Sequence, residues 1–226
     1  MASNNVSKPA RTTPSVRVSY PTLFTPRAFQ PGNDPKYGIV MMFEKTNKEH
    51  MAFLKLMHQD CELAMGEKWP KAETRPRVAL IGDTRSPIKD GDKTLNNNGI
   101  PLCENNPEYA GHFIIRANTS SRPVVVDRNK AEILDSNEVY GGCFCKVNLN
   151  CYTFDMSANK GVTFGLNGVQ KWSDGESFGG GRPGLDEMFE ASAGQDNPEN
   201  YAAGNDPFAG TAPSVIPEVV GGNPFG

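Results

Sequence analysis

Aromatic, amide and cationic side chains alternate with small apolar ones along residues 143–154. Successive side chains of a β-strand point to opposite faces, so this run divides into two sets. One set suits a core: Cys143, Cys145, Val147, Leu149, Cys151 and Thr153. The other set carries rings, amides and a cation: Phe144, Lys146, Asn148, Asn150, Tyr152 and Phe154. Rings on such a face can stack with unpaired nucleobases while cations hold phosphates. The alternative is that the rings pack under a loop or the C-terminal segment, or at a dimer contact.

A loop over residues 155–161 predicts that this strand forms a hairpin with residues 162–172. If the hairpin closes symmetrically, residue 154 pairs with residue 162, although a slip of one residue would move the second arm to the other face. The symmetric register places four residues on the polar face, opposite Tyr152, Asn148, Lys146 and Phe144 in turn: Phe164, Gly168, Gln170 and Trp172.

Two further groups of cations could line a path for a nucleic-acid backbone. The first contains Arg75, Arg77, Arg85, Lys89 and Lys93, and the second contains Arg116, Arg122 and Lys160. Each group alone is typical of a solvated surface, so only convergence on one groove would give it a binding role. We predict phosphate contacts for four of them: Arg77, Arg85, Arg116 and Lys160.

The charge of the chain is divided unevenly. All 23 Lys and Arg residues lie at or before Arg182, whereas seven of the 26 acidic residues follow it. Such asymmetry suggests an interaction tail on a body that meets a polyanion. An acidic segment can occupy the cationic groove of its own body until a polyanion displaces it. The alternative is an ordinary solubilising, disordered end.

The remaining pattern predicts a strand-rich body with one helix. Strands are expected at Val16–Tyr20, Tyr37–Phe43, Val78–Ile81, His112–Asn118 and Pro123–Val126. Pro21, Pro26, Pro31 and Pro35 predict an extended loop between the first two. A capping box at Thr46 and Glu49 should start a helix that runs to about Glu67, and residues 83–111 should form long loops. Short strands with one packed helix favour a five-stranded Greek-key barrel.

Neither a metal site nor catalytic machinery is expected. Three of the five cysteines, at 143, 145 and 151, share the core face, and the three histidines do not cluster with cysteines in the sequence. The Gly179–Gly181 run is not followed by the residues of a phosphate loop. We therefore expect a protein that is not an enzyme and has no cofactor. The N-terminus has no apolar run typical of a signal peptide, which predicts a cytoplasmic location without membrane contact.

Several segments together resemble a family of phage single-stranded DNA-binding proteins. They are Gly141-Gly142, Lys146-Val147-Asn148, Gly161–Gln170, Asp174-Gly175-Glu176, Gly179–Gly181 and the opening Pro21–Phe24 with Tyr37. The resemblance covers about residues 15–182, and its specific part is 141–181. It implies an oligonucleotide-binding (OB) barrel similar to the T7-type phage protein and a mobile acidic tail. We accordingly predict a flexible N-terminus (1–14), a DNA-binding domain (15–182) and a flexible Gly/Pro-rich acidic tail (183–226).

Two Pro-Phe pairs in the tail look like the acidic tip by which bacterial single-strand binding proteins dock replication enzymes. They are Asp206-Pro207-Phe208 and Pro224-Phe225. In that tip phenylalanine is the terminal residue, whereas here Gly226 follows, which argues against docking through a terminal carboxylate. The alternative is that both pairs arise by chance in a Pro-rich segment.

The resemblance implies sequence-independent coating of single-stranded DNA in phage replication, recombination or repair, in the cytoplasm of an infected bacterium. Expected partners are single-stranded DNA and, through the tail, replication or recombination proteins, with a possible homo-oligomer. Two alternatives remain open. One is a strand-annealing protein that uses the same surface, and the other is a structural phage protein without DNA affinity.

Overall fold

A closed five-stranded barrel is the centre of the computed structural model, which describes residues 5–28, 32–71, 73, 86–156 and 159–179. Its strands are β2 (Val16–Arg27), β3 (Lys36–Glu44), β5 (His112–Thr119), β7 (Phe144–Met156) and β8 (Asn159–Ser173). β7 pairs with both β2 and β8, which closes the order β2–β3–β5–β8–β7. Only β5 and β8 run parallel within this ring of described strands. The predicted mainly β, OB-type barrel is confirmed.

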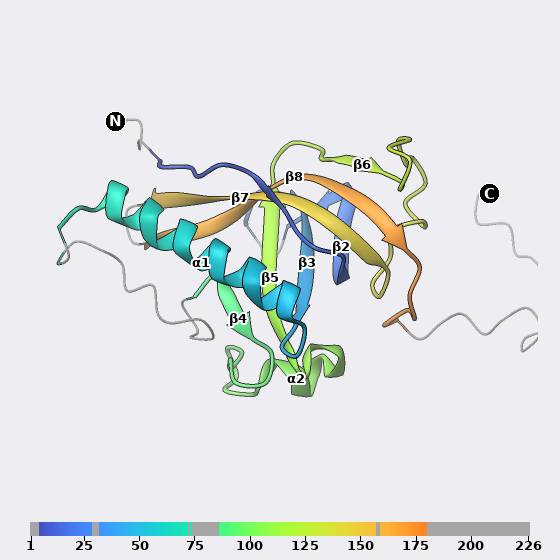
Figure 1. The fold of residues 1–226 in the computed structure, drawn as a ribbon, viewed down its shortest axis with the longest axis horizontal. Coiled ribbons are helices and arrows are strands. Elements are labelled where there is room, and N and C mark those ends of the chain that lie inside the picture. The colour runs from blue at the N-terminus through green and yellow to red at the C-terminus, as the bar shows by residue number, and fades with distance from the viewer. Residues whose placement is uncertain (1–4, 29–31, 72, 74–85, 157–158, 180–226) are drawn as a thin grey trace, which may run out of the picture. The chain divides into compact units, whose positions relative to one another are not determined.

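Shorter elements extend the barrel. β1 (Arg11–Thr12) pairs with β7, β4 (Ile88–Asp90) with β5, and β6 (Val124–Val126) with β8. One long helix, α1 (Lys48–Lys68), passes in front of the barrel below the β7–β8 hairpin, and the short α2 (Leu102–Asn105) and η2 (Pro107–Tyr109) lie with β4 at its lower end (Figure 1). Among the described helices, none combines the length and apolar character that a bilayer span requires.

Apolar side chains from all five barrel strands fill the interior. Val16, Met41, Ile115, Leu149 and the ring of Phe43 are each at most 1% exposed. Alternate residues of β7 point into this core, as the sequence predicts. Because one face of β7 is buried, the side chains on its other face must point outward. A shift of the strand register by one residue would expose the core residues.

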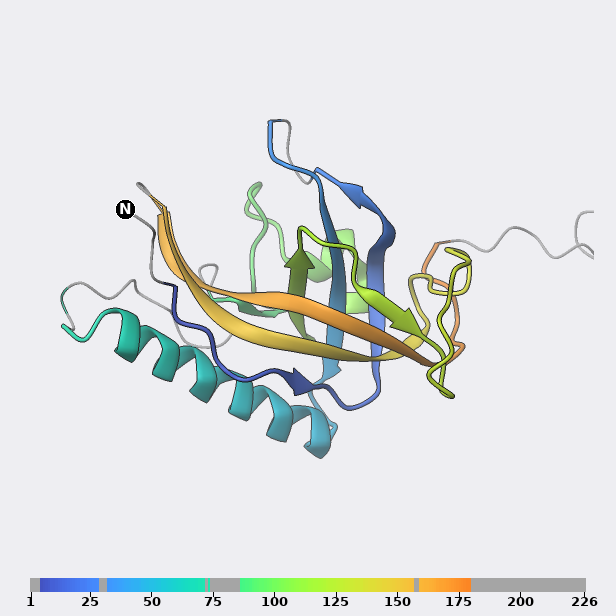
Figure 2. The same ribbon diagram turned by 90° about the horizontal axis from the view of Figure 1, so that it is seen from above.

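Helix α1 packs beside the hairpin with the N-terminal segment between them in the view of Figure 2. The Phe53 ring stacks on Phe43, with 5.6 Å between ring centroids, and Cys61 Sγ lies 3.4 Å from Cys151 Sγ. The cap residue predicted for this helix is wrong. Asn47, not Thr46, accepts hydrogen bonds from the backbone N–H groups of residues 49 and 50. Asn47 occupies the N-cap position itself, and the Thr46 hydroxyl instead donates to Glu44 Oε1.

Several predicted boundaries shift. β2 continues through Pro21 and Pro26, where the pairing with β3 is irregular and ladder N–H groups are not required. The predicted strand Val78–Ile81 lies outside the described residues. Part of the expected loop 83–111 forms β4, α2 and η2. Residues 6–13, assigned to a flexible N-terminus, pair along β7, through Lys8 N–H to the Cys151 carbonyl and Thr13 N–H to the Val147 carbonyl.

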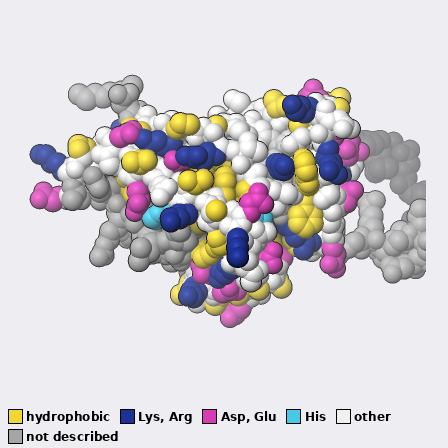
Figure 3. All heavy atoms as spheres, viewed as in Figure 1, with side chains coloured by type: hydrophobic (Ala, Val, Ile, Leu, Met, Phe, Trp, Pro, Cys, Tyr) yellow, Lys and Arg dark blue, Asp and Glu magenta, His cyan; other side chains and the backbone are white. Residues whose placement is uncertain are grey.

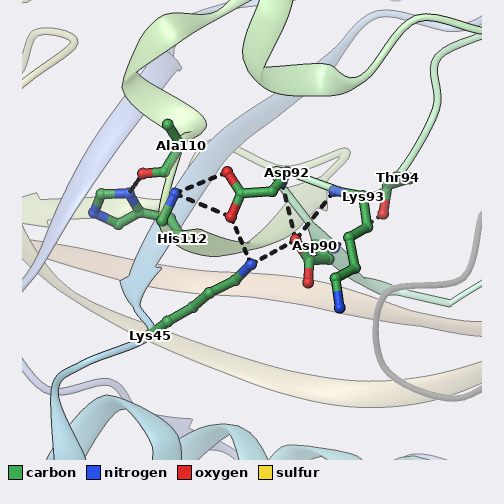
Figure 4. A network of polar contacts seen from close by, with 8 residues as sticks. Lys45, Asp90, Asp92, Lys93, Thr94, Ala110 and His112 are labelled. Carbon is green, nitrogen blue, oxygen red and sulfur yellow. Dashed lines mark hydrogen bonds and ion pairs between the residues drawn. The ribbon is translucent and has the colours of Figure 1, made fainter.

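A polar network attaches the β4 region to the end of β3. Lys45 Nζ lies 2.6 Å from Asp90 Oδ1 and 2.7 Å from Asp92 Oδ2, and the Asp92 carboxylate also accepts the Gly111 N–H (Figure 4). The hydrogen bond from Lys45, together with that from Gly111, lowers the pKa of Asp92 below its usual value of 3.8. Since the ionised form is favoured in the folded state, Asp92 contributes stability above its unfolded pKa.

We therefore predict that Asp92→Asn lowers the free energy of unfolding by about 0.5 kcal/mol at neutral pH, because this ion pair is partly exposed. The difference from the wild type should be full above about pH 5 and disappear as the pH falls through 3.8 and below the folded pKa. Urea unfolding at several pH values measures it. Asp34→Asn, at an exposed position of the β2–β3 connection, is the control. A difference that grows on acidification would contradict the assignment.

Candidate nucleic-acid interface

The outward face of β7 carries the side chains singled out from the sequence. Burial alternates along the strand from Phe144 to Phe154, with the rings, amides and Lys146 half-buried and the intervening residues in the core. The described residues include no group of three His, Cys, Asp or Glu side chains that could hold a metal ion. The rings of this face can stack, and its amides and Lys146 can form hydrogen bonds.

The register of the hairpin is only partly as predicted. Lys146 pairs with Gln170 and Asn148 with Gly168, as expected. Nearer the tip the pairing continues to Met156–Asn159, so the symmetric closure at residue 154 is wrong by one residue. Asn167 is a β-bulge, an extra residue of β8 that has no partner on β7. Beyond this bulge the two strands follow the predicted register.

This shift corrects the place of Phe164. Tyr152 pairs with Thr163, and Phe164 instead lies opposite Cys151, where its ring is 1% exposed. Phe164 is therefore a core residue and cannot contact DNA. Phe144 likewise pairs with Ser173 and not with Trp172, because a second irregularity of the ladder lies at this end.

Tyr152 and Phe154 lie against glycines of β8. A Cβ atom at Gly161 would come within 3.0 Å of the Phe154 ring, and one at Gly165 would come within 3.3 Å of the Tyr152 ring. The absence of a side chain on β8 lets both rings approach its backbone closely. Burial raises the pKa of Tyr152, so its hydroxyl stays protonated at neutral pH. Each ring thus has a fixed position on the sheet.

These rings border a groove of about 620 Å³ that crosses four strands. One side is the hairpin near its tip, and the other is formed by the end of β5 and the start of β3. Its lining includes Lys36, Asn118, Thr119, Asn150, Tyr152 and Phe154. Arg116 is exposed on β5 and, being two residues from Asn118, shares its outward face. Lys36 and Asn118 were missed from the sequence, because no local pattern shows that β3 and β5 converge on the hairpin.

The other end of the same face is more cationic. Two cations lie over the ring of Trp172, with Lys146 Nζ 3.7 Å and Arg128 Cζ 4.5 Å from its centroid. A second hollow of about 350 Å³ adjoins it, lined by Lys130, Lys146, Asn148 and Gln170 among others. Lys and Arg side chains lie beside hydrophobic ones at this end of the hairpin, on the right of Figure 3.

An amide bridge separates the two hollows. Asn167 Nδ2 donates to Asn148 Oδ1, and Asn148 Nδ2 donates to Thr12 Oγ1, both at 3.0 Å. Asn150 Nδ2 donates to Ser7 Oγ at 2.9 Å. The amides of β7 therefore hold the N-terminal segment at the edge of the interface.

Phe144 and Lys160 are placed differently from the other predicted contacts. The Arg17 guanidinium lies over the rings of Phe178 and Phe144, 4.3 and 5.8 Å from their centroids. A Cβ atom at Gly175 would be 3.1 Å from Phe144, so this ring packs under the segment that follows β8. Lys160 Nζ lies 6.0 Å from the Trp69 ring centroid, on the α1 side of the hairpin and away from the groove. The remaining predicted contacts lie outside the described residues. They are Arg77 and Arg85, together with the tail residues Asp206, Pro207, Phe208, Pro224 and Phe225.

A closed barrel with rings, amides and cations on one outer face defines an OB-type nucleic-acid-binding protein. The family described as "Enterobacter phage Enc34, ssDNA-binding protein" matches residues 11–200, and the chain belongs to this family. It is 27% identical over 186 residues to putative protein p50 of Acyrthosiphon pisum secondary endosymbiont phage 1, covering 80% of this chain and 94% of that protein.

Solved structures agree with this membership. The single-stranded DNA-binding protein from bacteriophage Enc34 in complex with ssDNA matches with a TM-score of 0.59 and 28% identity, covering 75% of this chain and 89% of that chain. A single-stranded DNA-binding protein encoded by bacteriophage T7 matches with a TM-score of 0.50 and 15% identity, covering 82% and 97%. The second similarity is one of fold.

The strand register places Phe164 in the core and Tyr152 on the outward face, which predicts how much each truncation destabilises the fold. Phe164→Ala should lower the free energy of unfolding by about 3–5 kcal/mol, because it leaves a cavity in the core. Tyr152→Ala, a similar truncation on the outward face, should cost clearly less. Urea unfolding of both variants measures the difference. Equal losses would contradict the assignment of these two rings to opposite faces.

Proposed function

We propose that the protein coats single-stranded DNA without sequence preference and without catalysing a reaction. The observation that carries this proposal is the pair of rings, Tyr152 and Phe154, held against glycine backbone inside a groove that crosses the barrel. A ring in that position offers a flat surface to a base, and every base has a π-face, so stacking tolerates any sequence.

Charges around the face supply the second requirement. Lys36 lines the groove, and Arg116 is exposed on the face of β5 that Asn118 shares. Lys130 and Lys146 line the hollow at the other end, and Arg128 lies over the nearby Trp172 ring. A DNA strand that follows the hairpin from Tyr152 to Trp172 would keep its phosphates near these cations. Complex formation by the Enc34 protein with ssDNA supports the same ligand class here.

The acidic segment after Arg182 is proposed to compete with DNA for these cations in the free protein. Displaced by DNA, it would present its Pro-Phe pairs to replication, recombination or repair proteins. This division assigns DNA binding to residues 15–182 and recruitment to residues 183–226, on the basis of their charges. Strand annealing would need the same face together with pairing of two coated strands.

Binding to oligo-dT, followed by tryptophan fluorescence, tests the proposed function. We expect Tyr152→Ala to weaken binding roughly 5- to 150-fold, equivalent to about 1–3 kcal/mol of stacking. The logarithm of the affinity should fall with the logarithm of the salt concentration, with a slope of about −0.7 per phosphate neutralised. Leu63→Ala, on the exposed side of α1, is the control and should bind as the wild type. Absence of binding, together with a regular oligomer, would instead indicate a structural protein.

Removal of the acidic segment should change the affinity for DNA. A chain ending at Arg182 should bind oligo-dT more tightly than the full chain, and the gain should shrink as salt screens the competition. Titrations of both chains at several salt concentrations measure this. Unchanged affinity at low salt would show that the segment does not compete with DNA.

A further inference from the structure

Asparagines and glycines alternate in one row across four strands of the groove. Strand pairing joins Gly38 of β3 to Asn118 of β5, Asn118 to Gly165 of β8, and Gly165 to Asn150 of β7. Asn118 therefore has a glycine on each side, so no side chain from β3 or β8 flanks it in the row. Asn118, Gly165 and Asn150 all line the groove.

Gly165 lets two side chains of β7 lie close against the backbone of β8. A Cβ atom there would lie 2.9 Å from Asn150 Oδ1 and 3.3 Å from the Tyr152 ring, so even alanine would crowd both groups. The Asn150 side chain and the Tyr152 ring therefore cover Gly165 from the β7 side, and Asn118 is its partner on β5. The wall of the groove at this point consists of one aromatic ring and two amides.

Asn118 Oδ1 has an unmet hydrogen-bonding requirement. Among the described residues it is a buried side-chain oxygen that accepts no hydrogen bond. A buried acceptor without a donor costs free energy, and such atoms in a native structure are exceptional. The oxygen belongs to a residue that lines the groove, so a ligand in the groove can supply the missing donor.

The ligand's chemistry limits which of its parts can do so. Phosphate oxygens are acceptors at neutral pH and cannot donate to a carbonyl oxygen. Base edges can donate, through the exocyclic amines of adenine, cytosine and guanine. Thymine and guanine also carry ring N–H groups on the edge used for base pairing. Every base therefore offers at least one donor to a single acceptor.

We propose that Asn118 Oδ1 accepts a hydrogen bond from the pairing edge of a base that stacks on the Tyr152 ring in the groove. This inference rests on the proposed function and adds a second recognition element to it. Stacking selects a base over a sugar or phosphate by its face, and Asn118 selects it by its edge. One acceptor that any base can satisfy is compatible with sequence-independent binding, and it favours unpaired bases, because pairing occupies the same edge.

The test compares oligo-dT with the same oligonucleotide built from N3-methylthymidine, which lacks the edge N–H. For the wild type, methylation should weaken binding about three- to tenfold, the usual range for one net hydrogen bond. Asn118→Ala should weaken binding of unmodified oligo-dT by a similar factor. Methylation should then change the affinity of this variant by less than about twofold, because the contact is already lost. A methylation penalty equal in the two proteins would overturn the inference.

Controls separate this inference from the proposed function. Asn98→Ala, at an exposed turn before α2, should behave as the wild type with both oligonucleotides. Asn118→Ala should fold, because it removes an oxygen without a partner; if circular dichroism shows otherwise, Asn118→Ser replaces it and should restore part of the methylation penalty. If Tyr152→Ala leaves oligo-dT binding unchanged, the proposed binding groove itself is wrong. If Tyr152→Ala weakens binding but Asn118 and methylation act independently, the inference about the base edge alone fails.

Discussion

Pairing between β7 and β8 is the constraint on which the rest of the interface depends. It closes the barrel, and the burial of one face of β7 forces the rings and amides of the other face outward. It also sets Tyr152 and Phe154 over glycines of β8, so the positions of the rings follow from backbone register and not from contacts among the rings themselves. Two extra residues in β8, at Asn167 and Trp172, then adjust the far end of the same face.

The two ends of this face differ in what they offer. Near the tip, the groove presents rings and amides with few charges, which suits contact with bases. At the other end, Lys146 and Arg128 both lie over the ring of Trp172, which suits contact with phosphates. A single strand laid along the hairpin meets both environments in turn. The N-terminal segment, attached by the amides of β7, forms one edge of this path.

Local patterns revealed the strand alternation of β7 and the mainly β class, because both arise from neighbouring residues in the chain. The sequence could not show the bulge at Asn167, so it placed Phe164 on the wrong face. It also could not show that Gly175 brings the chain back over Phe144, since that contact joins residues far apart. Asn118 was overlooked for the same reason, because its two glycine neighbours, Gly38 and Gly165, are brought to it only by strand pairing.

Photocrosslinking can locate the bases of bound DNA on the surface of this protein. Oligo-dT that carries 5-iodouracil couples on irradiation to aromatic side chains in contact with the base, and mass spectrometry of the digested protein identifies the coupled residues. We expect crosslinks at Tyr152, Phe154 or Trp172, on the outward face of the β7–β8 hairpin. Crosslinks confined to aromatic residues elsewhere, such as Tyr20 or Phe24 of β2, would contradict it.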